Sequence, residues 1–224
     1  TYGHFLLVFL VGPICVLTLL LRRRLSRRYV SATAAMATVA VVYTTPWDNY
    51  IVALGVWTYA PARIWGIVLG VVPLEEYLFY GLQTILTAQV LLAVAPRLGR
   101  APDRPGPARR GTPDESRSLV VPGVPLLVPG AAAAAGTLTY LVLETGWALP
   151  VIALQWVLGH EVLRARWRAL VTAVALPSLY LTLADALAIR EGVWTLSPAL
   201  TLGVAPAGIV LEEALFFLLT NAML

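Results

Sequence analysis

The chain has 224 residues, of which 59% are hydrophobic and only 12% are charged, and its mean hydropathy is +0.79. A soluble domain carries about 25% charged residues, so this composition argues against a soluble protein and predicts an integral membrane protein. The net charge of +4 comes from arginine alone, because the chain has no lysine. We interpret that charge as a signal of membrane topology and expect no nucleic-acid partner. The lone cysteine excludes an intramolecular disulfide.

Apolar runs of about 20 residues, which are long enough to cross a bilayer, recur along the chain. They predict an all-α membrane protein with seven spans, at residues 3–21, 29–46, 64–95, 119–143, 147–163, 168–184 and 199–224. The third run is too long for one straight crossing and contains Pro73. A bend or a short re-entrant piece is therefore expected before Pro73.

The arginines predict the orientation of these spans. Fourteen arginines fall on one side of the seven-span arrangement, which leaves only Arg63 and Arg190 on the other. Because positive charge collects in cytoplasmic loops, we expect a multi-pass protein of the cell membrane with its N-terminus outside and its C-terminus in the cytoplasm. The basic loops are also expected to contact anionic lipid headgroups.

Residues 1–87 and 138–224 align without a gap at an offset of 137, which indicates an internal duplication. Gly55-Val56-Trp57-Thr58 recurs as Gly192-Val193-Trp194-Thr195, and Leu74-Glu75-Glu76 recurs as Leu211-Glu212-Glu213. A three-span unit copied directly would be inverted, and the extra span at 119–143 restores its direction. The sequence thus predicts two parallel three-helix repeats, at 1–96 and 138–224, related by an axis along the membrane normal. Residues 97–137 would form a cytoplasmic linker and most of a linker helix.

Both copies carry a pair of glutamates inside an apolar stretch. A carboxylate within a membrane costs about 2.5–3.5 kcal/mol on insertion scales, so Glu75, Glu76, Glu212 and Glu213 are candidate catalytic residues. If the two copies face each other, their carboxyls meet in one apolar chamber, with Glu75 and Glu212 flanking it. Desolvation and like-charge repulsion there favour a carboxyl that stays protonated at neutral pH. The alternative is that the glutamates satisfy helix ends or pair with arginines.

A second group of residues lies at the outer ends of the second and sixth spans. Asp48 and Asp185 each precede their glutamate pair by 27 residues and are further candidates for acid–base work. Aromatic rings near such a chamber would stabilise a carbocation by about 0.5–2 kcal/mol each, although tryptophans also form belts at the headgroup level. The candidate substrate-binding residues are Trp47, Asn49, Trp57, Phe79, Gln83, Trp194, Phe216, Thr220 and Asn221.

Several enzyme classes lack their motifs in this sequence. There is no glycine-rich dinucleotide fingerprint, no H-E-x-x-H, no G-x-S-x-G and no aspartate pair spaced to hold Mg²⁺ against a diphosphate. We therefore expect no cofactor and no metal. What remains is redox-neutral acid–base chemistry on an apolar substrate dissolved in the membrane.

The stretch from Pro73 to Gln83 resembles the P-x-E-x-x-x-F-x-x-x-Q motif of the membrane-integral lycopene cyclase domain, in its fused tandem form. Trp47-Asp48-Asn49 and the second-copy run from Glu212 to Asn221 are similar to that family's pattern as well. One departure is that Pro206 stands six residues before Glu212, where Pro73 stands two before Glu75.

The resemblance implies cyclisation of the open ψ-ends of lycopene to β-ionone rings, with a glutamic acid as proton donor. It also implies an isoprenoid or carotenoid substrate in the bilayer, with upstream enzymes of the isoprenoid pathway as candidate partners. A related membrane terpene cyclase that acts on a prenylated aromatic or indole-type compound is an alternative.

Two alternatives come from other classes of protein. An intramembrane glutamic protease requires E-E-x-x-x-R, but Tyr80 and Phe217 occupy the arginine position here. A small transporter with parallel repeats would place its carboxylates along an aqueous path, whereas the neighbours of Glu75 and Glu212 are strongly apolar.

Overall fold

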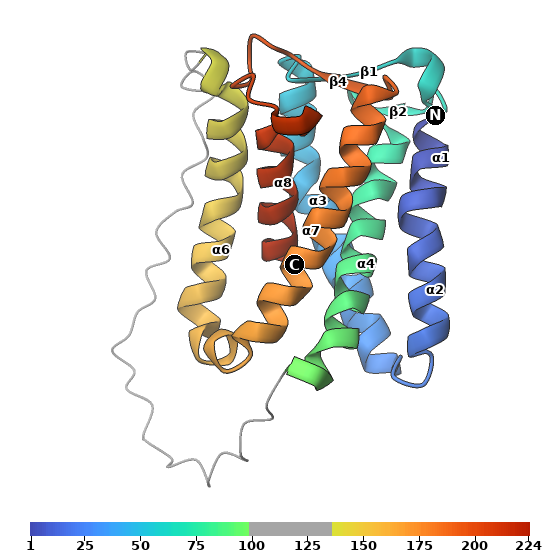
Figure 1. Ribbon diagram of the computed structural model, residues 1–224, viewed down its shortest axis with the longest axis vertical. Coiled ribbons are helices and arrows are strands. Elements are labelled where there is room, and N and C mark those ends of the chain that lie inside the picture. Colours follow the sequence, from blue (N-terminus) through green and yellow to red (C-terminus); the bar gives the residue numbers. More distant parts are fainter. Residues whose placement is uncertain (99–135) are drawn as a thin grey trace, which may run out of the picture.

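The computed structural model describes residues 1–98 and 136–224, which form a bundle of helices running along a common axis (Figure 1). The first half begins with three helical segments that follow one another without a break: α1 (Tyr2–Leu6), the π-helical turn η1 (Leu7–Val11) and α2 (Gly12–Leu21). The helices α3 (Arg27–Ala53) and α4 (Leu74–Leu98) follow. The second half contains η3 (Gly136–Leu138), α6 (Thr139–Ala165), α7 (Trp167–Arg190) and α8 (Leu211–Met223).

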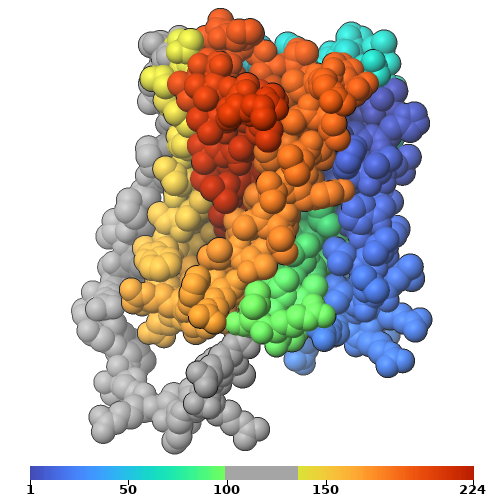
Figure 2. All heavy atoms as spheres, in the orientation of Figure 1, coloured from blue at the N-terminus to red at the C-terminus, as the bar shows by residue number. Residues whose placement is uncertain are grey.

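Short elements join these helices at one end of the bundle. They are β1 (Trp57–Tyr59), η2 (Pro61–Arg63), β2 (Val68–Leu69), β3 (Val72–Pro73), β4 (Trp194–Leu196) and η4 (Pro206–Gly208). In Figure 1 they cap the upper end of the helices, and in Figure 2 α7 and α8 lie in the middle of the face turned to the viewer, between α6 and the N-terminal helix.

The apolar composition gives an all-α membrane protein. Within the described residues, four helical stretches are long and apolar enough to cross a bilayer: Tyr2–Leu21, Leu74–Leu98, Gly136–Ala165 and Trp167–Arg190. The predicted spans at 29–46 and 199–224 are not among them. The second of these contains one α-helix, α8, whose 13 residues are about 20 Å long, short of the roughly 30 Å of a hydrocarbon core. The count of seven spans stays a prediction.

Two predicted boundaries differ from the structure for local reasons. The third span begins at Leu74, because residues 68–73 form the β2–β3 hairpin, an irregular piece of the kind expected before Pro73. In the predicted span at 199–224, the helix α8 begins only at Leu211. The positive φ angles of Gly203, Ala207 and Gly208 interrupt any helix before that point.

A third boundary was predicted wrongly between residues 143 and 147, where α6 runs without a break from Thr139 to Ala165. Glu144 and Thr145 look like loop residues in the sequence. In the structure Glu144 is fully buried, and the Thr145 hydroxyl donates to the Leu141 carbonyl at 2.6 Å. Both polar side chains are therefore compatible with a continuous helix. Most of the predicted span at 119–143 lies outside the described residues.

The described arginines separate to the two ends of the bundle. Nine of them lie at the end formed by the α2–α3 turn, the end of α4 and the α6–α7 turn: Arg22, Arg23, Arg24, Arg27, Arg28, Arg97, Arg164, Arg166 and Arg168 (Figure 1). Arg63 and Arg190 lie at the opposite end, with the strands. The end of α4 and the start of α6 also lie at opposite ends of the bundle (Figure 1).

Equivalent residues of the two sequence copies contact one another at two levels of the bundle. Strands β1 and β4 pair antiparallel with Thr58 opposite Thr195, and their hydroxyl oxygens are 2.7 Å apart. Deeper in the bundle, Gln83 Nε2 donates to Thr220 Oγ1 at 2.8 Å. Both pairs are separated by 137 residues, the offset of the sequence repeat.

Candidate active site

A small cavity lies beneath the paired strands β1 and β4. Its volume is about 20 Å³, enough for about one water molecule, so a bulkier ligand requires the surrounding side chains to move. The helices α1, α4, α7 and α8 and both strands contribute to it. Its lining residues are Tyr2, Trp57, Tyr59, Glu76, Phe79, Asp185, Trp194, Glu213, Phe216 and Phe217. We call this cavity the chamber.

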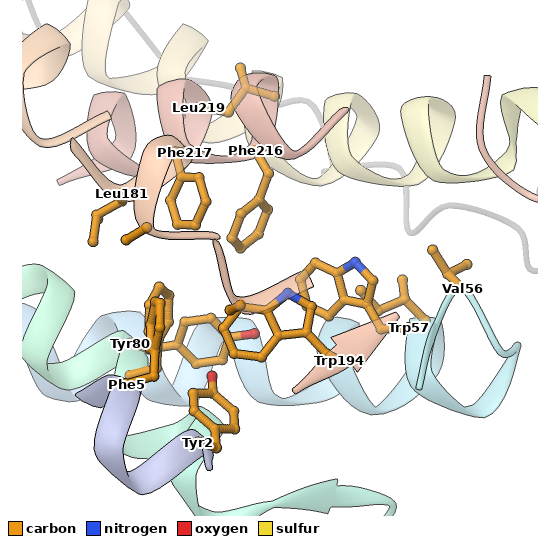
Figure 3. Close-up of a cluster of buried hydrophobic side chains, with 14 of the residues drawn as sticks. Tyr2, Phe5, Val56, Trp57, Tyr80, Leu181, Trp194, Phe216, Phe217 and Leu219 are labelled. Atoms are coloured by element: carbon orange, nitrogen blue, oxygen red, sulfur yellow. The ribbon is translucent and has the colours of Figure 1, made fainter. Parts of the chain in front are cut away.

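Aromatic rings form most of the chamber wall. Tyr2 lies against Tyr59 and Trp194, with ring centroids 6.1 and 4.9 Å apart, and Trp57 meets Phe216 edge-on at 5.3 Å. In Figure 3 the rings of Phe216 and Phe217 point from α8 toward Trp57 and Trp194, with Tyr2 on the opposite side. Such a wall presents the electron-rich faces of several rings to whatever occupies the chamber.

Glu76 receives two phenol hydrogen bonds on one carboxyl oxygen. Tyr2 donates to Glu76 Oε2 at 2.5 Å and Tyr59 donates to the same atom at 2.9 Å. Burial raises the pKa of the Tyr59 phenol well above its ordinary value, so this side chain keeps its proton and remains a donor. Hydrogen bonds to a carboxylate stabilise its charged form. These two donors distinguish Glu76 from Glu213, which receives no hydrogen bond from Tyr2 or Tyr59.

Glu213 is held in a different way. Trp57 Nε1 donates to Glu213 Oε1 at 3.0 Å, and Trp194 Nε1 donates to Asp185 Oδ1 at 2.9 Å. The carboxyls of Asp185 and Glu213 lie against each other. Two neighbouring carboxyls in an apolar site cannot both ionise readily, so such a pair holds a shared proton. This side of the chamber suits an acid.

The first glutamate of each pair does not line the chamber. Glu75 Oε1 accepts from the Trp65 backbone N–H at 2.5 Å, and Glu212 Oε1 accepts from the Leu202 N–H at 2.5 Å. Each bond ties a loop to a helix start ten residues later. The expectation that Glu75 and Glu212 flank the chamber therefore differs from the structure. Adjacent helical residues point about 100° apart, so only one glutamate of each pair faces inward.

The remaining predicted residues of the first copy lie around the chamber. Asp48 is fully buried, with no hydrogen bond to either oxygen, beside Tyr80 and Glu76. Trp47 stacks on Phe216 with centroids 5.9 Å apart. Asn49 faces away and holds the β2–β3 hairpin, because its Oδ1 accepts from the Val71 N–H at 3.0 Å.

The predicted amides and hydroxyl form a polar layer one to two helical turns below the chamber. Gln83 Nε2 lies 2.8 Å from Thr220 Oγ1 and 3.3 Å from Asn221 Oδ1, and all three side chains are buried. Asn221 also donates to the Ser178 hydroxyl at 3.1 Å. These residues connect α4, α7 and α8 and do not line the chamber.

Sequence reasoning missed several polar groups near the chamber. Tyr2 comes from the N-terminal helix and Tyr80 from α4, and neither has a tyrosine at the matching position of the other copy. Tyr140 and Glu144 on α6 are fully buried close to Glu213. The sequence could have indicated this last pair, because Glu144 follows Tyr140 by one helical turn in an otherwise apolar stretch.

Apolar helices that enclose acidic side chains among aromatic rings define a membrane protein with a buried acid–base site. Comparison with known families gives a match to the lycopene cyclase family over residues 1–95 and 137–224. The chain belongs to that family.

Curated relatives agree with this assignment. The lycopene beta-cyclase of Halobacterium salinarum is 35% identical over 224 residues, which cover 99% of this chain and 91% of that protein. The bifunctional lycopene cyclase/phytoene synthases of Phaeosphaeria nodorum and Arthroderma gypseum are 34% and 33% identical. The chain spans 38% of the length of each of these two fungal proteins. No solved structure matches the chain.

Proposed function

We propose that this protein is a lycopene β-cyclase, which closes the ψ-ends of lycopene to β-ionone rings without a redox cofactor or a metal. The observation that carries the proposal is the chamber, where Glu76 and the Asp185–Glu213 pair lie in one aromatic-walled space. Membership of the lycopene cyclase family supports the substrate, and the apolar helices support a substrate dissolved in the bilayer.

The reaction is an isomerisation in which one proton enters and one leaves. A carboxylic acid protonates C2 of the terminal C1=C2 double bond, which leaves a tertiary cation at C1. The C5=C6 double bond attacks C1, so the C1–C6 bond forms and the positive charge moves to C5. A carboxylate then removes the proton from C6, which restores the C5=C6 double bond inside the new ring. No electron acceptor is required.

The neighbours of each carboxyl indicate which one gives the proton and which one accepts it. The Asp185–Glu213 pair is the proton donor, because two adjacent carboxyls hold a proton between them. Glu76 is the base, because the phenols of Tyr2 and Tyr59 stabilise its charged form. Trp57, Trp194 and Phe216 stabilise the intermediate cations, at about 0.5–2 kcal/mol for each suitably placed ring. Glu75 and Glu212 hold the loops that close the chamber.

The proposal includes an architecture of two parallel repeats, at 1–96 and 138–224, in a seven-span protein with its N-terminus outside. The contacts of Thr58 with Thr195 and of Gln83 with Thr220 support a local two-fold axis along the bundle, since each joins equivalent positions of the two copies. The nine arginines at one end support a cytoplasmic location of that end.

The test is to express the chain in a host that accumulates lycopene and to extract the pigments. We expect cyclised carotenoids from the wild type and unchanged lycopene from Glu213→Gln and Glu76→Gln. Cyclisation by the membrane fraction in D₂O should add one deuterium for each ring formed, because the donated proton exchanges with solvent. Rings formed without deuterium would refute acid initiation, and no rings from a folded wild type would refute the substrate.

A further inference from the structure

An apolar groove lies directly below the chamber, between α3, α4, α6 and α8. Its volume is about 150 Å³, much larger than that of the chamber, and most of its lining is aliphatic or aromatic. Tyr43 and Val39 on its rim are exposed, so the groove opens toward the lipid. Its lining residues are Met36, Val39, Ala40, Tyr43, Thr44, Tyr80, Gln83, Thr84, Trp147, Val151, Thr220, Met223 and Leu224.

The groove continues the chamber along the helix axes. On α4, Glu76 and Phe79 line the chamber, whereas Tyr80 and Thr84 line the groove. Eight helical residues from Glu76 to Thr84 correspond to about 12 Å. On α8 the order is the same, with Phe216 in the chamber and residues 220, 223 and 224 in the groove.

Two side-chain barriers separate the groove from the chamber. The first barrier is Tyr80, which lies beside Glu76 and Asp48 on one side and faces the groove on the other. The second barrier is a cluster of three nearly parallel rings, Trp47, Trp147 and Phe216, whose centroids are 4.4 to 6.5 Å apart.

The equivalent place in the other half of the molecule is filled. The counterparts of Trp147 and Tyr80 are Leu10 and Phe217, and Leu10 is fully buried. Phe9 packs against Tyr180, the counterpart of Tyr43, with centroids 6.4 Å apart. The N-terminal helix is the counterpart of α6, and its Phe9 and Leu10 pack inward where α6 borders the groove, so the two halves differ in the space that they offer a ligand.

We propose that this groove binds the extended isoprenoid chain of the substrate while one of its ends reacts in the chamber, with Tyr80 between chain and reacting end. The inference rests on the proposed function and adds the path of the substrate to it. An apolar chain of many carbons does not fit in a space of about 20 Å³. The groove adjoins the chamber, opens to the bilayer and is apolar, as a conjugated hydrocarbon requires. Because the groove leads to the chamber from one side, one end of a two-ended substrate reacts while the rest of its chain lies in the groove.

The test fills the groove at Ala40 and uses Ala35 as the matched control. Ala40 lines the groove, whereas Ala35 lies on the same helix, is exposed and does not line it. Purified Ala40→Trp should show a KM for lycopene raised about tenfold or more, the scale at which apolar pockets discriminate by fit. Ala35→Trp should match the wild type. Val151→Trp, on the opposite wall of the groove, should raise the KM as Ala40→Trp does. It replaces Ala40→Trp in the test if Ala40→Trp does not fold.

A binding measurement separates this proposal from the chemistry. In the inactive Glu213→Gln background, lycopene retained after purification should fall about tenfold on adding Ala40→Trp and should not change on adding Ala35→Trp. If the wild type cyclises lycopene while both groove variants retain normal KM and normal binding, the groove proposal is wrong and the proposed function stands. A phospholipid retained in place of lycopene, with turnover unaffected by Ala40→Trp, would likewise overturn it. If the wild type binds lycopene through the groove but forms no rings, the proposed function fails instead.

Discussion

The adjacent glutamates at the start of α4 permit a sharp comparison, because the same substitution at neighbouring positions should have different consequences. Glu76 lines the chamber and accepts two phenol hydrogen bonds, whereas Glu75 accepts one backbone hydrogen bond from a loop. Both are buried and both lie in the first helical turn. Glu→Gln at each position preserves size and one acceptor oxygen but removes the titratable group.

For Glu76→Gln we expect lost turnover with retained folding. A glutamine cannot remove the C6 proton, and loss of a general base costs about 10²–10⁴ in rate. Its carbonyl oxygen still accepts a bond from Tyr2 or Tyr59, so the packing around it survives.

For Glu75→Gln we expect nearly normal kcat and lower stability. A hydrogen bond to a charged group contributes about 1.5–3 kcal/mol, whereas a neutral one contributes about 0.5–1.5 kcal/mol. The substitution should therefore cost about 1–2 kcal/mol. At about 2–4 °C per kcal/mol for a chain of this size, Tm should fall by several degrees.

The assay combines pigment conversion by purified protein in lipid nanodiscs with thermal unfolding of the same samples. Glu213→Gln and Glu212→Gln repeat the comparison in the second copy. Glu213→Gln should lose activity, whereas Glu212→Gln should lose stability. If Glu75→Gln abolished turnover without loss of Tm while Glu76→Gln cyclised lycopene normally, the assignment of the chamber carboxyls would be wrong.

Four further predictions concern a phenol of the chamber, the pH dependence of activity, metal dependence and membrane topology. Tyr59→Phe removes one of two donors to Glu76 and should lower kcat about tenfold, the equivalent of about 1.4 kcal/mol; an unchanged kcat would contradict the role of the phenol. Because burial raises the pKa of Tyr59, the wild type should show no loss of activity from ionisation of this phenol up to about pH 10. Chelator should leave turnover unchanged, whereas a loss restored by Mg²⁺ would refute the metal-free reaction. Reporter fusions in the loop Arg97–Arg117 should report the cytoplasm, and an external signal would reverse the proposed orientation.

The sequence repeat predicted most of the chamber wall but not its polar geometry. The offset of 137 residues brought Trp57, Trp194, Phe216 and the glutamate pairs to notice, because apolar sequence around repeated acids is unusual. It did not predict which glutamate of each pair faces inward. That choice depends on the rotation of α4 and α8 about their own axes, which is decided by packing between helices far apart in the sequence.

The hydrogen-bond partners of Glu76 and Glu213 also could not be predicted from the local sequence pattern. Tyr2 is 74 residues away from Glu76, and Trp57 is 156 residues away from Glu213. The β1–β4 pairing carries Trp57 across to the other half, and two-residue or three-residue strands leave little periodicity to detect. The continuous helix α6 was missed for a related reason, since a buried Glu144 resembles a loop residue until its surroundings are known.

The differences between the two copies explain how a duplicated unit can perform an asymmetric reaction. A chamber with strict two-fold symmetry would offer identical carboxyls, but the cyclisation needs one group that gives a proton and another that accepts one. Tyr59 and Tyr80 of the first copy correspond to Leu196 and Phe217 in the second. The second copy therefore lacks these two phenols, and the neighbours of Glu213 are the indole of Trp57, the carboxyl of Asp185 and the phenol of Tyr140, which comes from α6. In the proposed reaction, repetition supplies two matching acids, and the different hydrogen-bond donors around Glu76 and Glu213 distinguish the base from the acid.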